Sequence, residues 1–140
     1  MLLQPASAIT AGVVLLTVIG IAYGGTFMLR VVTGKQGAND LQKSFFRAGH
    51  AHAGVLVILG LVVLVLLDAA GVTSWMHVAA IGVLATAILI PGGFFLSVLG
   101  RDPQRPNGVI ALVWVGFGVL TVSLVIAGIA LIGAGAAQVG

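Results

Sequence analysis

The amino-acid sequence predicts an all-α integral membrane protein, a single membrane domain (residues 1–140) built as a four-transmembrane-helix bundle. Hydrophobic residues fill 60% of its 140 positions and charged residues only 6%, whereas a soluble domain keeps about a quarter of its residues charged. Four apolar runs, at about 8–32, 48–67, 78–99 and 108–132, each reach the roughly 20 residues that a helix needs to cross a bilayer. In lipid the backbone must satisfy its own hydrogen bonds, so runs of this length are expected to be helical.

Positive charge is confined to one end of the predicted bundle. The cations lie in or beside residues 33–47 and 100–107, and they are Arg30, Lys35, Lys43, Arg47, Arg101 and Arg105. The other end carries only Asp68. Because cytoplasmic loops are enriched in Lys and Arg, loops 33–47 and 100–107 are expected in the cytoplasm and both termini outside. Cations held in two short loops do not form the basic face of a nucleic-acid binder, so no nucleic-acid partner is expected.

The two halves of the chain show a faint internal similarity. Gly24-Gly25-Thr26-Phe27 stands near the end of the first apolar run, and Gly92-Gly93-Phe94-Phe95 stands near the end of the third. Each glycine doublet lies about two turns before a basic loop. The pattern predicts two tandem helical hairpins, a style of repeat found in membrane proteins. A sequence this rich in glycine and apolar residues would also produce such a similarity by chance.

Two histidines enter the otherwise apolar second run, at His50 and His52. Ionisable residues at membrane depth are uncommon, and imidazole can ligate haem iron or copper or hydrogen-bond a quinone. Residues two apart on a helix point about 200° from each other, so these two are not expected to share one metal. His77 is expected roughly 25–30 Å from His52 in depth. A haem shared with a partner subunit therefore stays open, as does a structural place for both histidines at the membrane boundary.

Small residues and one proline mark the expected helix contacts. Gly20 and Gly24 form a GxxxG pair, and Ser123 and Ala127 have the same spacing, which lets membrane helices pack backbone to backbone. Pro91-Gly92-Gly93 is expected to kink the third helix because proline interrupts the hydrogen-bond ladder. Broken helices also bind substrates in transporters, but such sites recruit more polar side chains than this run offers.

No catalytic constellation can be assembled from the remaining residues. The chain has no cysteine, and its three acidic residues, Asp40, Asp68 and Asp102, are expected in connections rather than paired. We therefore expect no enzyme, no self-contained metal site and no cofactor bound by this chain alone.

The plan of four helices with a His-x-His opening the second resembles small four-span membrane proteins of bacteria, some of which are similar to fragments of haem–copper oxidase subunits. The Gly-, Ala- and Val-rich composition resembles actinobacterial proteins, whose four-span accessory subunits attach to respiratory complexes and Mce lipid importers. This resemblance implies a bacterial plasma membrane, contacts with membrane lipids and a non-enzymatic accessory role in a lipid-transport or respiratory assembly. The alternatives are a haem- or metal-binding redox protein using His50 or His52, and a small-solute transporter or channel.

Overall fold

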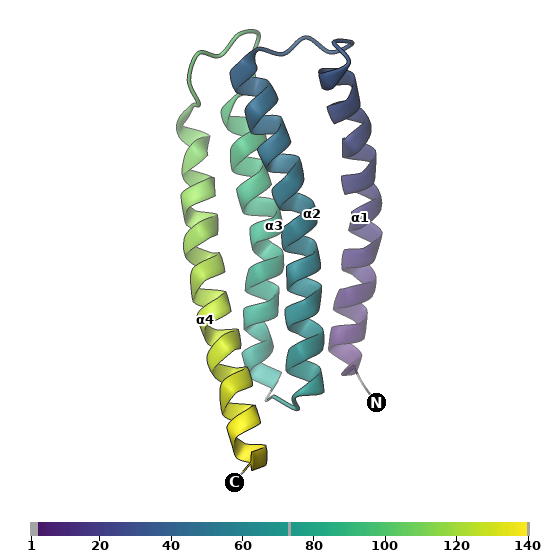
Figure 1. Ribbon diagram of the computed structural model, residues 1–140, viewed down its shortest axis with the longest axis vertical. Coiled ribbons are helices and arrows are strands. Elements are labelled where there is room, and N and C mark those ends of the chain that lie inside the picture. Colours follow the sequence, from purple (N-terminus) through teal and green to yellow (C-terminus); the bar gives the residue numbers. More distant parts are fainter. Residues whose placement is uncertain (1–2, 73, 140) are drawn as a thin grey trace.

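The computed structural model describes residues 3–72 and 74–139 and forms a bundle of four long helices (Figure 1). In chain order the elements are α1 (Pro5–Val32), α2 (Asp40–Ala69), the 3-10 helix η1 (Ser74–His77), α3 (Val78–Ser97), the 3-10 helix η2 (Gly108–Ile110) and α4 (Ala111–Val139). All four long helices are long and apolar enough to span a membrane. The prediction of an all-α membrane bundle with four spanning helices is confirmed. Figure 1 shows residues 33–39 and 98–107 at one end, the basic end, and both termini at the opposite end, the terminal end.

Helices α1, α2 and α4 extend beyond the apolar runs, whereas α3 ends at Ser97, two residues before its expected end. The largest difference lies at the start of the second helix. Helix α2 begins at Asp40 instead of about residue 48, so only residues 33–39 of the expected loop 33–47 lie outside a helix. Asn39 caps α2 by accepting a hydrogen bond from the Gln42 amide at 2.9 Å, while the Gln42 side chain accepts one from the Asn39 amide at 3.1 Å. This capping box stabilises a polar first turn that hydropathy cannot detect. Helix α4 likewise continues to Val139, beyond the expected end at about residue 132.

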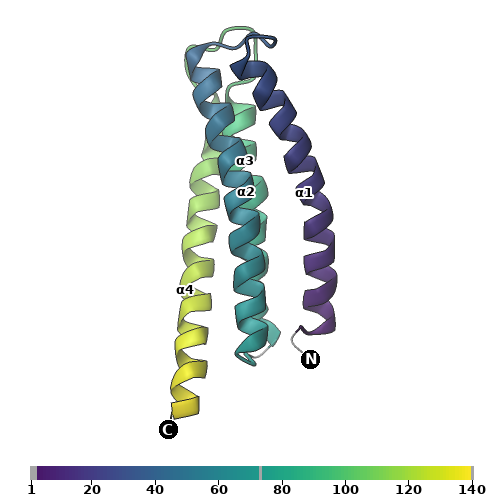
Figure 2. The ribbon, with the colours of Figure 1, turned by 45° about the vertical axis from the view of Figure 1, so that its right-hand side comes forward.

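Helices α2, α3 and α4 form the packed centre, and α1 lies at the side. In the apolar stretch of each helix, 33% of the residues are buried in α2, 39% in α3 and 17% in α4, against only 6% in α1. Among the described helices α1 packs against α2 alone, and Figure 2 shows it standing apart from α4. An apolar groove of about 440 Å³ is left between α1 and α3, with Val57 of α2 among the residues that line it.

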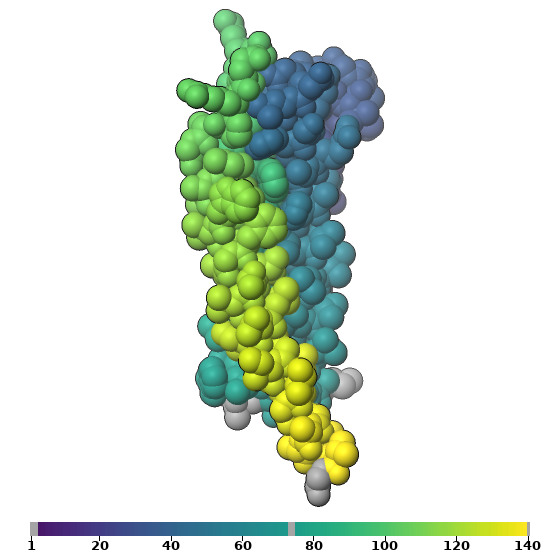
Figure 3. All heavy atoms as spheres, turned by 60° about the vertical axis from the view of Figure 1, so that its left-hand side comes forward, coloured from purple at the N-terminus to yellow at the C-terminus, as the bar shows by residue number. Residues whose placement is uncertain are grey.

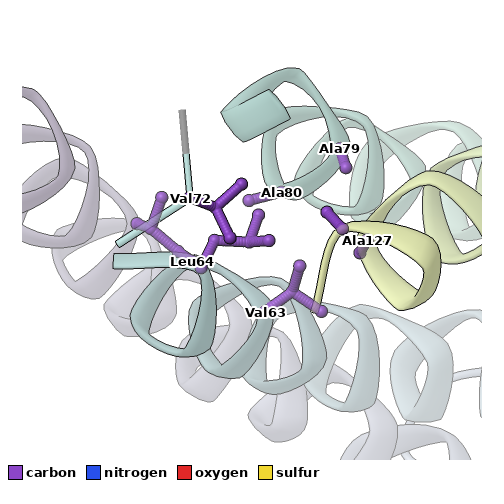
Figure 4. Close-up of a cluster of buried hydrophobic side chains, with 8 residues drawn as sticks. Val63, Leu64, Val72, Ala79, Ala80 and Ala127 are labelled. Atoms are coloured by element: carbon purple, nitrogen blue, oxygen red, sulfur yellow. The ribbon is translucent and has the colours of Figure 1, made fainter. Parts of the chain in front are cut away.

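Small residues bring the central helices close together. A cluster of buried side chains at the terminal end joins Val63 and Leu64 of α2 to Ala79 and Ala80 of α3 and to Ala127 of α4 (Figure 4). Glycines serve the same purpose elsewhere, because a Cβ added at Gly93 would lie 2.8 Å from the backbone nitrogen of Val113. Small residues therefore let the central helices approach each other closely, as expected where helices associate in lipid.

The segment Pro91-Gly92-Gly93 lies inside α3, which continues through it as one helix from Val78 to Ser97. Pro91 and Gly93 are buried, and Gly93 faces the start of α4. Of the first doublet, Gly24 and Gly25 face His50 of α2. Both glycines of the first doublet thus lie against α2, whereas in the second doublet only Gly93 lies against α4 and nothing would lie within 4 Å of a Cβ on Gly92.

Candidate functional site

A polar cluster at the terminal end connects three segments of the chain through Asp68. The Oδ1 atom of Asp68 accepts hydrogen bonds from the Ser7 hydroxyl at 3.1 Å and from Nε2 of His77 at 2.5 Å. Its Oδ2 atom accepts one from the backbone amide of Gln4 at 2.9 Å. The Asp68 side chain is only 1% exposed, so these bonds replace the water that a carboxylate requires.

Local structure brings each member of this cluster into place. Asp68 lies in the last turn of α2, and Ser7 lies in the first turn of α1, just after Pro5. His77 ends the 3-10 helix η1, which leads into α3. The Asp68 carboxylate therefore joins the start of α1, the end of α2 and the start of α3, close to the boundary where the apolar segments end.

The cluster contains an aspartate–histidine pair, an arrangement that elsewhere orients a general base. Since Nε2 of His77 donates to Asp68, its Nδ1 is the nitrogen left over, and this atom is buried without a hydrogen-bond partner in the described part of the chain. The Ser7 hydroxyl donates to the same carboxylate oxygen as His77. No group of three or more potential metal-ligating side chains occurs among residues 3–72 and 74–139. The geometry is that of a link between helices.

The sequence predicted Asp68 to lie in a connection, but Asp68 lies in the last turn of α2, and its pairing with His77 was not predicted. The available signal was that Asp68 is the only charged residue between Arg47 and Arg101, with His77 nine positions later. A lone carboxylate at an apolar helix end must be satisfied by nearby polar groups, and few are present there.

The two histidines of α2 point to different neighbours. Positions that a Cβ would occupy on Gly24 and Gly25 lie 3.8 and 3.7 Å from the His50 ring, so His50 faces α1. His52 donates from Nδ1 to the Ala48 carbonyl at 2.8 Å, and its ring centre lies 5.4 Å from that of Phe94 in α3. The structure brings these histidines neither together nor near His77, which belongs to the cluster around Asp68.

The residues predicted to pack helices divide into two groups. Ser123 and Ala127 are buried, with Ser123 directly facing Gly82 of α3. Gly24 contacts the His50 ring of α2, whereas nothing would lie within 4 Å of a Cβ on Gly20. The GxxxG pair of α1 therefore presents one glycine to α2 and leaves the other on the outer surface.

The basic end is held together by a second set of hydrogen bonds. The buried Gln42 side chain donates to the carbonyl oxygens of Val98 and Gly100, both at 3.0 Å. The Asn39 side chain donates to Asp102 at 2.7 Å and to the Pro103 carbonyl at 2.8 Å. These bonds attach the start of α2 to the connection between α3 and α4, and sequence reasoning missed both residues because an amide in a polar loop carries no distinctive pattern.

Comparison of the chain with protein-family models, with curated proteins and with solved structures found no match. The function is therefore proposed from the residues and their geometry.

Proposed function

We propose that this protein is a non-enzymatic accessory subunit that packs against a larger assembly, lipid-transporting or respiratory, in a bacterial plasma membrane. The observation that supports this proposal best is the outer face of α1. That face lies opposite the contact with α2 and is exposed along its whole length; its residues are Ile9, Gly12, Leu16, Ile19, Gly20 and Tyr23.

Both glycines on the outer face of α1 are open, since nothing would lie within 4 Å of a Cβ on Gly12 or on Gly20. Glycine costs helix stability relative to alanine, so an exposed glycine in a membrane helix is best explained by close approach of another helix. Helix α4 runs along the near face of the bundle in Figure 3. It shows the same combination, with an open Gly118 and the exposed side chains of Trp114, Val115 and Val122. Helices α1 and α4 thus each carry an exposed face on which a helix of a partner subunit could pack.

The polar groups fit an accessory role because they connect helices. Ser7 and His77 both donate hydrogen bonds to Asp68, and the Asn39 and Gln42 side chains donate to backbone carbonyls at the other end. In the proposed orientation the basic end is cytoplasmic and both termini are outside, because all six cations lie at the basic end.

The proposal is tested by purifying the protein from its own membrane in a mild detergent and identifying co-migrating proteins by mass spectrometry. We expect a defined membrane partner that is retained by the wild type and lost by Gly20→Leu. Ala22→Leu adds similar bulk at an exposed position that points about 200° away from Gly20 around the helix, so it is the matched control and should keep the partner. A monodisperse protein with no partner would contradict the proposal.

A haem- or metal-binding role is the second candidate, and His50 is the residue that favours it. In the described part of the chain the His50 ring forms no hydrogen bond and lies against Gly24 and Gly25 of α1. The same purified material decides between the candidates. A Soret band or bound copper that disappears in His50→Ala would replace the accessory proposal by a redox one.

A further inference from the structure

A notch at the basic end combines positive charge with an apolar floor. It lies between the end of α1 and the start of α2 and has a volume of about 180 Å³. Met28, Val31 and Val32 line it from α1, and Lys43 and Arg47 line it from α2. Two cations one helical turn apart thus border a surface that prefers hydrocarbon to water.

The two cations are presented by a fixed segment of helix. Gln42 and Phe46 point inward on adjacent turns, where Gln42 donates to the Val98 and Gly100 carbonyls and the Phe46 ring stacks on Phe95 at 5.5 Å. Lys43 and Arg47 follow these residues by one position each and therefore face outward together. Because the inward neighbours are anchored, the spacing of the outward cations does not depend on a mobile loop.

The charges of these cations are largely uncompensated within the chain. Lys43 forms an ion pair with Asp40 at 3.2 Å, but the Asp40 side chain is 99% exposed and shields little. In the described part of the chain Arg47 has no salt bridge. The notch therefore favours a ligand that joins an anionic group to an apolar group.

The surface of α2 below the notch continues as an apolar stripe. Ala51, Gly54, Val55 and Ile58 follow Arg47 on the same side of the helix, and Val55 and Ile58 are both more than 60% exposed. From Arg47 to Ile58 the helix rises about 16 Å, which is half the thickness of a typical hydrocarbon core. The stripe has the length of one acyl chain in one leaflet.

We propose that an anionic phospholipid of the leaflet at the basic end binds here, with its phosphate between Lys43 and Arg47 and one acyl chain along Ala51, Gly54 and Ile58. A free phosphate ion would satisfy the cations and leave the apolar floor uncovered. This site is independent of the proposed accessory role, because it lies on α2 and the inner side of α1, away from the outer face of α1.

The test uses delipidated full-length protein in detergent and measures its thermal unfolding during titration with phosphatidylglycerol, with phosphatidylcholine or with inorganic phosphate. We expect phosphatidylglycerol to raise the melting temperature more than either alternative. In the double variant Lys43→Gln/Arg47→Gln the apparent affinity for phosphatidylglycerol should fall by about tenfold or more. The matched control Arg101→Gln/Arg105→Gln removes the same charge from the same end and should keep the wild-type response.

A second variant protects the test against a folding defect in the charge variants. Val32→Trp fills the notch at a residue that is 67% exposed and changes no charge, so it should fold and still lose the preference for phosphatidylglycerol. Equal losses in both charge variants would attribute binding to the general potential of the basic end and overturn the site. An equal response to inorganic phosphate, or a Val32→Trp variant that binds normally, would overturn it as well.

Discussion

Asp68 shows how much a single buried carboxylate organises in this bundle. Replacing it by alanine leaves the Gln4 amide, the Ser7 hydroxyl and the His77 ring without their acceptor. We expect Asp68→Ala to lower the free energy of unfolding by roughly 3 kcal/mol, because breaking a buried hydrogen-bonded pair strands its partners. Unfolding in detergent micelles, followed by circular dichroism, measures this loss.

Asp40→Ala is the control for that measurement, since the Asp40 side chain is 99% exposed and its ion pair with Lys43 is solvated. It should change stability little. If both substitutions cost the same, the hydrogen bonds of Asp68 do not stabilise the bundle.

At the residue scale, helical periodicity could predict that His50 and His52 face apart, and in the structure one faces α1 and the other α3. It could not predict the pairing of Asp68 with His77. That pair forms only because the turn between α2 and α3 closes back through η1, and the route of a turn depends on tertiary packing. Hydropathy treats both residues simply as polar.

At the scale of the helices, α3 and α4 depend on the absence of a side chain at Gly93. A Cβ there would lie 2.8 Å from the Val113 backbone nitrogen and 2.6 Å from a Val113 methyl carbon, and backbone cannot move cheaply. We expect Gly93→Ala to destabilise the protein by about 1–3 kcal/mol through overpacking. Thermal unfolding in detergent measures the change.

The neighbouring Gly92 provides the matched control, because nothing would lie within 4 Å of its Cβ. Gly92→Ala should be neutral or stabilising by up to about 1 kcal/mol, since alanine is the better helix former. Opposite signs for two adjacent, chemically identical substitutions can arise only from packing. A similar loss at both positions would point instead to a requirement for backbone flexibility in this segment of α3.

The four helices could be predicted from the apolar runs because length in hydrocarbon is what hydropathy measures. The ends of the helices could not be predicted in this way, since they depend on capping hydrogen bonds. Helix α2 starts at Asp40 because Asn39 and Gln42 form a reciprocal pair, and this polar turn looks like a loop to any measure of hydrophobicity.

At the scale of the whole molecule, the charge asymmetry predicts how the bundle is inserted. The chain has no native cysteine, so a single cysteine introduced at Lys35 or at Gln138 becomes a unique label. In intact cells we expect an impermeant maleimide to spare the Lys35→Cys variant until the cells are opened. Gln138 is exposed at the terminal end, so the Gln138→Cys variant should react at once. The reverse pattern would invert the proposed orientation.

The position of α1 at the side of the bundle was beyond prediction because all four runs are comparably apolar. Nothing in their composition distinguishes a helix surrounded by others from one that touches a single neighbour. The difference arises from where small residues meet, as at Gly93 with Val113 and at Gly82 with Ser123, and such complementarity involves residues far apart in the sequence.

The peripheral packing of α1 also has a consequence for biosynthesis. Helix α1 leaves the ribosome before its packing partner α2 and the acceptor Asp68 are made, and His77 is made later still. A membrane helix satisfies its backbone hydrogen bonds on its own, so α1 can be stable in the bilayer before α2 packs against it. Helix α1 is therefore made before α2 and α3 but is among the last of the four helices to be fixed in place, once the segment that carries His77 has been translated.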